Sequence, residues 1–348
     1  MNSIKIQNLK VGDFYKPIII AEVGQAHLGD FNKAKKYIDA AVFAGADCIK
    51  FQTHIALEES TEDDVFRSSN PYKKLSRYNY WKKMEFSYEQ WFSLKKYADK
   101  KKIIFLSSAF SIKAFEILSK IKVQCWKLGS GEYKSMDLID KMVSTKKPIL
   151  FSTGIMNNAE INFLAKYLIL KKSKFAIFQC TSMYPTDPKN IGLNILTELK
   201  KKYKCPIGLS DHSGTIYPSL AAMTLGANII EVHFKIEDNK YNLDSKASLN
   251  INDLKTVCDG SQYIYTLIKS KTNKNRINHQ AKIIKKNFTK SIAVKINLKK
   301  GSILTKDIIT FKKPGNGIDP NDIDKILGKK IIKDIKNTKL LKWSDIEK

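Results

Sequence analysis

The sequence contains no long hydrophobic run and only a few cysteines. No stretch of about 18 uncharged apolar residues occurs in its 348 residues, so we expect no membrane-spanning helix and no membrane partner. The opening residues, MNSIKIQNLKVGDF, lack the basic, apolar and small-residue succession of a signal peptide, which predicts a cytoplasmic protein. The five cysteines are scattered and form no CxxC pair, so neither a disulfide framework nor a four-cysteine zinc site is expected.

Arginine is almost absent, although the chain is strongly basic. Lysine and arginine together number 61, of which three are arginine, and the net charge is +27. Residues 268–348 contribute +15 of this charge. Arginine is the residue best suited to base edges and phosphates, and no RGG, RNP or zinc-finger pattern accompanies the lysines. We therefore interpret the charge as a solvated lysine surface and expect no nucleic acid as a partner. A non-catalytic protein that binds anions or nucleic acid through the basic tail stays a distant alternative.

Glycine-rich nucleotide-binding loops are also missing. The first apolar run is followed by GQAHLGD rather than GxGxxG, and no P-loop occurs. The chain instead alternates short apolar runs with stretches of helical periodicity. The predicted strands cover residues 17–24, 47–52, 102–108, 124–130, 148–153, 174–180, 205–210 and 227–233, and helices are predicted over 31–45, 88–100, 112–120 and 251–269. Eight such units in about 250 residues predict an α/β fold of the (β/α)8 TIM-barrel type, with an open doubly wound sheet as the alternative.

Two segments depart from this alternation. Residues 53–86 form a connection far longer than the usual βα loop, which we interpret either as a surface excursion or as a lid over the barrel mouth. Beyond the last predicted helix, a polar, lysine-rich stretch precedes short β-like runs that are broken by KKGS, KKPGNG and DPND. We therefore predict a catalytic barrel over residues 1–270, a linker over 271–287 and a small, mainly-β domain over 288–348.

The predicted strand ends suggest a site for an anion. Active sites of such barrels lie at the carboxyl ends of the strands, and this sequence places polar residues there on all eight strands. Lys50 and Lys127 stand inside apolar strands, where an unpaired ammonium group is costly to bury, so we expect a bound anion to be their partner. Serines at five strand ends add hydroxyl donors: Ser108, Ser130, Ser152, Ser182 and Ser210. The set predicts a phosphate or carboxylate site, although any one serine alone is better explained by a turn or a helix cap.

Two histidines end neighbouring predicted strands. His212 and His233 are both compatible with structural hydrogen bonding, but together they suggest a divalent metal site. Because only two protein ligands are available, that site would be open and suited to polarising a carbonyl group. Glu22, Glu132 and Asp244 are candidates for binding substrate hydroxyls or moving protons.

Eight successive motifs resemble those of the sialic acid synthase family. They are IIIAEVGQAHLGD, IKFQTHIA, IFLSSAFS, WKLGSGE, ILFSTGIM, FQCTSMYP, IGLSDHSG and IIEVHF. FKKPGNGI, near the C-terminus, is similar to the hallmark of the antifreeze-like SAF domain of that family. The resemblance implies a TIM barrel followed by a SAF domain. It also implies condensation of phosphoenolpyruvate with an open-chain N-acyl hexosamine such as N-acetylmannosamine, which yields a nine-carbon 2-keto-3-deoxy acid and phosphate.

The resemblance also assigns roles to individual residues. The phosphoenolpyruvate positions are Lys50, Ser108, Lys127, Ser130, Ser152, Ser182 and Ser210, and the sugar positions are Gln52, Glu132, Asp244 and Lys313. His212 and His233 match metal ligands for Mn2+ or Mg2+, and with Glu22 they form the expected catalytic set. Family members are domain-swapped homodimers, so the same assembly is expected here.

Several positions depart from the commoner family pattern, and they concern the sugar. Ala26 stands before His27 where the family has Asn, and Ser182 also replaces Asn. Lys313 replaces an arginine that reaches the acyl group of the sugar across the dimer, and lysine lacks the planar fork of arginine. The identity of the sugar therefore stays open, with legionaminate or pseudaminate synthesis from a 2,4-diacetamido hexose as the alternative to N-acetylneuraminate synthesis.

Overall fold

The computed structural model describes residues 3–66, 72 and 75–348. The chain divides into two compact units, Met1–Ser270 and Lys271–Lys348. Each unit has its own apolar core. Among the described residues, no helix combines the length and the apolar character needed to cross a membrane.

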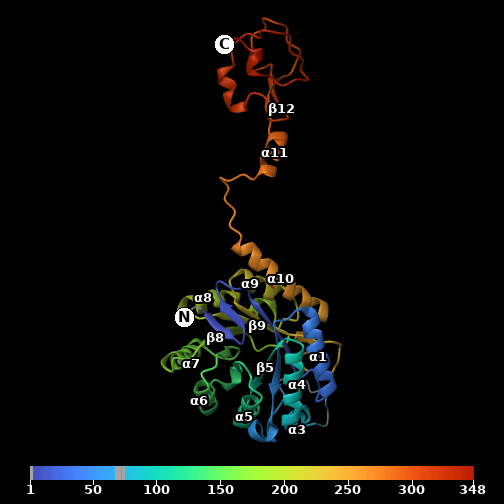
Figure 1. Ribbon diagram of the computed structural model, residues 1–348, viewed down its shortest axis with the longest axis vertical. Coiled ribbons are helices and arrows are strands. Elements are labelled where there is room, and N and C mark those ends of the chain that lie inside the picture. Colours follow the sequence, from blue (N-terminus) through green and yellow to red (C-terminus); the bar gives the residue numbers. More distant parts are fainter. Residues whose placement is uncertain (1–2, 67–71, 73–74) are drawn as a thin grey trace. The chain divides into compact units, whose positions relative to one another are not determined.

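The first unit is a closed barrel of eight parallel strands surrounded by helices, which confirms the predicted fold (Figure 1). Neighbouring strands follow one another in chain order, and the last strand closes the barrel against the first. The strands are β3 (Ile18–Gly24), β4 (Cys48–Thr53), β5 (Ile104–Ala109), β6 (Trp126–Leu128), β7 (Ile149–Ser152), β8 (Phe175–Cys180), β9 (Ile207–Asp211) and β10 (Ile229–His233).

The helices of this unit begin at ordinary capping residues. Asp30 accepts hydrogen bonds from two backbone N–H groups at the start of the first helix, and Ser87 and Gln90 form a capping box at the start of the fourth. The helices are α1 (Phe31–Ala44), α2 (Ala56–Glu59), α3 (Arg77–Met84), α4 (Tyr88–Lys100), α5 (Ile112–Lys120), α6 (Met136–Ser144), α7 (Asn158–Leu170), α8 (Leu193–Tyr203), α9 (Tyr217–Thr224) and α10 (Ile251–Lys269).

Residues inside the barrel change from apolar to polar along each strand. Because side chains alternate across a strand, Ile18, Ile20 and Glu22 share one face of β3, as Cys48 and Lys50 share one face of β4. The apolar members of these faces pack together at the amino ends of the strands. The polar members are therefore left together at the carboxyl ends, where parallel pairing sets Glu22 opposite Lys50.

A hairpin that the sequence analysis did not predict completes the apolar end of the barrel. Its strands are β1 (Ser3–Ile6) and β2 (Leu9–Gly12), which pair in antiparallel fashion. Ile4, Ile6 and Val11 of this hairpin belong to the same buried cluster as the inward-facing apolar residues of the barrel. They close the end of the barrel that is remote from the polar side chains.

The second unit begins in the predicted linker and contains the expected small β structure. Helix α11 (His279–Phe288) lies largely within the stretch predicted as a linker, and none of its residues is buried. Strands β11 (Ser291–Val294) and β12 (Ile309–Lys312) form an antiparallel pair, an isolated bridge joins Ala293 of β11 to Leu340, and further bridges join the segments around them. Isoleucine, leucine and valine residues of these segments form the core of the unit.

Candidate active site

One cavity at the carboxyl ends of the strands is lined by twelve of the predicted site residues. Its volume is about 510 Å3. The twelve are Glu22, Lys50, Gln52, Ser108, Lys127, Ser130, Glu132, Ser152, Ser182, Ser210, His212 and His233. Of the other two predicted residues, Asp244 lines a small adjoining cavity of about 60 Å3, and Lys313 belongs to the second unit.

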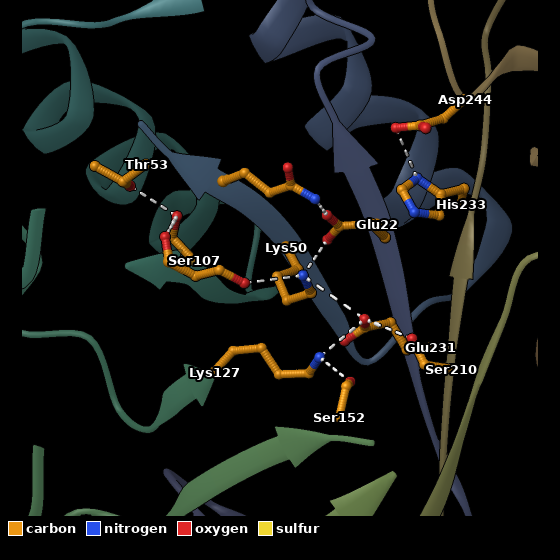
Figure 2. Close-up of polar contacts among 12 residues, drawn as sticks. Glu22, Lys50, Thr53, Ser107, Lys127, Ser152, Ser210, Glu231, His233 and Asp244 are labelled. Carbon is orange, nitrogen blue, oxygen red and sulfur yellow. Dashed lines mark hydrogen bonds and ion pairs between the residues drawn. The ribbon is translucent and has the colours of Figure 1, made fainter. Parts of the chain in front are cut away.

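Four buried charged side chains occupy the floor of this cavity, and we call Glu22, Lys50, Lys127 and Glu231 the charged centre (Figure 2). Nζ of Lys50 lies 2.7 Å from Oε2 of Glu22 and 3.7 Å from Oε1 of Glu231. Nζ of Lys127 lies 3.2 Å from the same Glu231 oxygen, which also accepts a hydrogen bond of 3.0 Å from Ser210. The two lysines and two carboxylates together carry no net charge when all are ionised.

This arrangement corrects one step of the sequence reasoning. The sequence predicted that Lys50 and Lys127 lack a protein partner and therefore need a bound anion. Glu22 and Glu231 are such partners, so the protein itself compensates both ammonium groups. The sequence analysis gave Glu231 no role, although a glutamate facing inward in the apolar strand IIEVH is as unusual as the lysines.

Burial and ion pairing shift the pKa values of the charged centre in different directions. Burial by itself raises the pKa of Glu231, but Lys127, Lys50 and Ser210 outweigh it and hold the pKa at about 2. For Glu22 burial prevails over the attraction of Lys50, so its pKa is raised. Burial also lowers the pKa of Lys127, which Glu231 offsets only in part. Glu231 is therefore firmly ionised, whereas Glu22 is the carboxylate that accepts a proton more readily.

Serine hydroxyls complete the coordination of the two lysines. Nζ of Lys50 donates to Oγ of Ser108 at 3.3 Å, and Nζ of Lys127 donates to Oγ of Ser152 at 2.7 Å. Each ammonium group therefore faces a carboxylate on one side and a hydroxyl on another. An incoming phosphate or carboxylate is a good acceptor for the same ammonium donors.

The side chains of two further serines, Ser130 and Ser182, approach each other next to Gly154 at the cavity wall. Ser130 and Ser182 have their Oγ atoms 3.5 Å apart. A Cβ atom on Gly154 would lie 2.2 Å from the Ser182 hydroxyl and 2.8 Å from that of Ser130. Glycine is therefore required at this position if both hydroxyls are to reach the cavity.

The histidine pair lies at the cavity edge in a form suited to metal binding. Ring centroids of His212 and His233 are 5.4 Å apart. Nδ1 of His212 lies 2.8 Å from the carbonyl oxygen of Thr181 and must donate to it, which leaves the lone pair on Nε2, beside the Tyr184 hydroxyl at 3.1 Å. Burial, reinforced by His233, lowers the pKa of His212 to about 3, so this ring is neutral. Nδ1 of His233 is buried, has no hydrogen-bond partner among the residues that the structure describes, and lies 3.8 Å from Oδ2 of Asp244.

These features fit a divalent cation with two protein ligands. A neutral imidazole whose tautomer is fixed by a backbone carbonyl is the usual form of a metal-binding histidine. Within residues 3–66, 72 and 75–348, no group of three or more His, Cys, Asp or Glu side chains is arranged to hold a metal. The remaining ligands of a cation held by His212 and His233 would therefore come from substrate or water.

The long connection between β4 and α4 forms part of the cavity wall. We call residues 54–87 the lid connection; residues 67–71 and 73–74 lie outside the described part of the chain. Its contributions to the cavity lining are His54, Glu59, Asp64, Arg77 and Trp81. The sequence analysis left open whether this segment is a surface excursion or a lid, and the described residues favour the lid because they line the cavity.

In the second unit, Lys313 lies beside an exposed aromatic residue. Its Nζ atom is 4.7 Å from the ring centroid of Phe288, which is 66% exposed. This cation–π contact holds the ammonium group near the PGNG turn. The pair offers an apolar surface and a positive charge side by side.

Comparisons with known proteins agree with this geometry. The profile of the NeuB family matches residues 37–273, and that of the SAF domain matches residues 289–347. The chain is 32% identical to the N,N'-diacetyllegionaminic acid synthase of Campylobacter jejuni, over 94% of this chain and 99% of that protein. It is 30% identical to the human N-acetylneuraminate-9-phosphate synthase, over 92% of this chain and 90% of that protein.

A solved structure of similar fold is that of the N-acetylneuraminic acid synthetase from Leptospira borgpetersenii in complex with citrate. The match covers 81% of this chain and 95% of the Leptospira chain, with a TM-score of 0.72 and 29% sequence identity. The family resemblance inferred from the motifs is thereby confirmed. More than half of the chain matches one family profile, so this protein belongs to the NeuB family, with a SAF domain at its C-terminal end.

Proposed function

We propose that this protein condenses phosphoenolpyruvate with an open-chain N-acyl hexosamine and water. N-acetylmannosamine is the first candidate acceptor, and the products are a nine-carbon 2-keto-3-deoxy sugar acid and inorganic phosphate. The observation that carries the proposal is the common cavity of about 510 Å3, in which two lysines, five serines, a histidine pair and Glu22 converge. Membership of the NeuB family supports the same reaction class.

Phosphoenolpyruvate binds at the charged centre by an exchange of partners. Its carboxylate and phosphate take acceptor positions on Lys50 and Lys127, with the hydroxyls of Ser108 and Ser152 at 3.3 Å and 2.7 Å from these ammonium groups. Lys50 then leaves Glu22, the partner that lies 2.7 Å from its Nζ atom in this structure. The buried Glu22 carboxylate, whose pKa is already raised by burial, becomes a better proton acceptor when that cation turns away.

The reaction joins C3 of phosphoenolpyruvate to the aldehyde carbon of the sugar. The electron pair of the C2–C3 double bond forms the new C–C bond, the aldehyde oxygen becomes an alkoxide and C2 becomes cationic. Water adds to C2 and gives one proton to the Glu22 carboxylate, which passes it to the alkoxide. The tetrahedral C2 then expels phosphate by breaking the C2–O bond, and the hydroxyl proton leaves with the phosphate. Holding both substrates in one cavity aligns C3 with the aldehyde before reaction.

A metal centre and the sugar subsite complete the proposal. His212 and His233 would hold a divalent cation, Mn2+ or Mg2+, which supplies Lewis-acid polarisation of a carbonyl when bound. Gln52 and Glu132, in the same cavity, and Asp244, in the adjoining one, bind hydroxyl groups of the sugar.

The assembly and the compartment are further parts of the proposal. Lys313 binds the acyl end of the sugar within a domain-swapped homodimer. The cytoplasm is the proposed compartment, as the sequence predicts.

A second acceptor class has equal support. The synthase from Campylobacter jejuni that makes N,N'-diacetyllegionaminic acid and the human N-acetylneuraminate-9-phosphate synthase are nearly equally similar to this chain, at 32% and 30% identity. A 2,4-diacetamido hexose, the acceptor for a legionaminate or pseudaminate synthase, is therefore the alternative substrate.

Phosphate release tests the function and selects the acceptor. The purified protein is incubated with phosphoenolpyruvate, Mn2+ and a panel of N-acyl hexosamines that includes both classes. We expect phosphate only when both substrates are present. Phosphoenolpyruvate labelled with 18O in the C2–O bridge should release labelled phosphate, and label retained in the keto acid would exclude cleavage of the C2–O bond. Phosphate release without a sugar would exclude the condensation.

A further inference from the structure

A chain of hydrogen bonds leads from the lid connection to the charged centre. Nδ1 of His54 lies 2.5 Å from Oε1 of Glu59, and its Nε2 lies 3.2 Å from Oε1 of Gln52. Nε2 of Gln52 donates to Oε1 of Glu22 at 2.8 Å. His54 and Glu59 are both buried, with side-chain exposures of 5% and 7%, and neither has a part in the reaction described above.

Two aromatic rings enclose the His54 imidazole. Its centroid lies 4.0 Å from the ring of Trp81, on α3, and 4.3 Å from that of Phe110, which follows β5. The interplanar angles are 20° and 9°. Two rings stacked nearly parallel at such distances must cover opposite faces, because they would otherwise occupy the same space. Trp81 is itself fixed, since its indole N–H donates to Asp64 at 3.2 Å.

The hydrogen-bond directions determine where His54 carries a proton. Glu22 is ion-paired with Lys50 and accepts, so the Gln52 amide must present its N–H to Glu22 and its oxygen to His54. The Gln25 amide has the matching orientation, and its Nε2 donates to the same Gln52 oxygen at 3.1 Å. His54 must therefore donate from Nε2, and the contact at Nδ1 needs a second proton between His54 and Glu59. An imidazolium paired with a carboxylate satisfies both bonds, and two aromatic faces favour the cation.

We propose that His54 is a positioning residue: as an imidazolium held by Glu59 and enclosed by Trp81 and Phe110, it fixes the Gln52 amide toward Glu22 and thereby prepares the acceptor-sugar site. Its ring is held partly by Glu59 and Trp81 of the lid connection, so the position of these two residues is transmitted to Gln52. The inference rests on the proposed function, because Gln52 is there assigned to the sugar. His54 acts through Gln52 and touches no reacting atom.

Several charged or titratable groups surround this pair. Besides Glu59, they are Glu22 on β3, Glu132 on the 3-10 helix after β6, Asp64 and Arg77 of the lid connection, and His27 in the turn after β3. Arg77 is paired with Asp64 at 3.2 Å, so its charge is compensated locally. Glu132 and Glu22 add negative potential and support the imidazolium form. His27 has its pKa lowered to about 3 by burial first and by His54 second, so it is neutral and does not oppose the charge.

Two substitutions of His54 separate its hydrogen bonds from its packing. His54→Phe keeps an aromatic ring between Trp81 and Phe110 but removes both hydrogen bonds, whereas His54→Gln places an amide N–H near the position of Nε2. We expect His54→Phe to raise KM for the sugar roughly 10-fold or more, the effect of losing a hydrogen bond that involves a charged group. KM for phosphoenolpyruvate should stay within about twofold, and His54→Gln should recover most of the loss. Equal impairment of the two variants, or equal effects on both substrates, would overturn the proposal.

The protonation of His54 is measured without reference to activity. Histidine labelled with 15N reports the state of each ring nitrogen, and the His54 signals are identified by their loss in His54→Gln. We expect both nitrogens of His54 to be protonated at neutral pH, and Glu59→Gln to leave a neutral ring with its proton on Nε2. An unprotonated Nε2 in the wild-type protein overturns the proposal, even if His54→Phe does not fold. If no sugar is turned over at all, the proposed function fails while this measurement still decides the role of His54.

Discussion

Replacing Glu231 by glutamine removes one negative charge from the charged centre and keeps the shape of the side chain. Glutamine still offers an oxygen to Lys127 at the position of the present 3.2 Å contact and to Ser210 at that of the 3.0 Å bond. What is lost is the ionic attraction to Lys127 and Lys50. The centre changes from a neutral cluster to one with a net positive charge.

The pKa of Glu231 gives the size of the loss. Its carboxyl group titrates at about 2 in the folded protein and at 4.5 in the absence of such partners. Because the folded-state pKa is the lower one, ionised Glu231 stabilises the fold above about pH 4.5, and this contribution is lost as the pH falls toward 2. At about 1.4 kcal/mol per pKa unit, the contribution at pH 7 is about 3 kcal/mol. For a domain of this size, such a loss lowers Tm by roughly 6–12 °C.

Thermal unfolding with and without phosphoenolpyruvate measures both consequences. At pH 7 we expect Glu231→Gln to unfold at lower temperature than the wild type, and phosphoenolpyruvate to raise Tm more in the variant, since the anion supplies the missing negative charge. Glu237→Gln is the matched control, because Glu237 pairs with Lys33 at 2.6 Å but is 57% exposed, and its loss should leave Tm essentially unchanged. An unchanged Tm in Glu231→Gln, or a smaller ligand effect than in the wild type, would refute the partner exchange.

Three other predictions follow from the proposed site. His212→Ala or His233→Ala should abolish turnover, while circular dichroism should show that the barrel stays folded. Full activity of either variant in the presence of a chelator would show that a metal has no part in the reaction. Glu22→Gln should still bind phosphoenolpyruvate but lose turnover, because the amide cannot accept the proton of the attacking water; turnover equal to that of the wild type would exclude Glu22 as the proton acceptor. Lys313→Ala should raise KM for the sugar roughly 10- to 100-fold without changing KM for phosphoenolpyruvate, whereas Lys313→Arg should be tolerated. Identical sugar KM values for Lys313→Ala and the wild type would show that Lys313 is only a solvated charge.

The barrel could be predicted because its strands and helices are indicated by short stretches of neighbouring residues. Each predicted strand overlaps an observed one, and β6 is the case in which the predicted range, 124–130, extends furthest beyond the observed Trp126–Leu128. Apolar runs and helical periodicity depend on neighbouring residues, which the sequence displays directly. The β1–β2 hairpin was missed for the opposite reason: its residues alternate too briefly to distinguish a strand, and its stability comes from covering the distant ends of the barrel strands.

The list of site residues could also be read from the strand ends, but their partners could not. Lys127 and Glu231 lie 104 residues apart along the chain and meet only because the barrel closes. The pairing of His54 with Glu59 is local, yet its enclosure by Trp81 and Phe110 depends on where the lid connection returns to the barrel. Residue type and position along a strand predicted many of the side chains that line the cavity, whereas the pairing of their charges required the closed fold.

The net charge of the whole chain and the charges of the cavity have different effects on an anion. The chain as a whole carries +27, and this lysine excess attracts any anion toward the protein. The charged centre is different, because two lysines face two carboxylates there and a passing anion finds no uncompensated charge. An anion enters only if it can replace those carboxylates on Lys50 and Lys127 and also satisfy the serine hydroxyls beside them. A ligand with both a carboxylate and a phosphate, spaced to reach both ammonium groups, meets that condition better than phosphate alone. In the proposed binding mode, the buried glutamates therefore compete with the incoming anion for the two ammonium groups. This competition would make the site selective, although the lysine-rich surface attracts any anion.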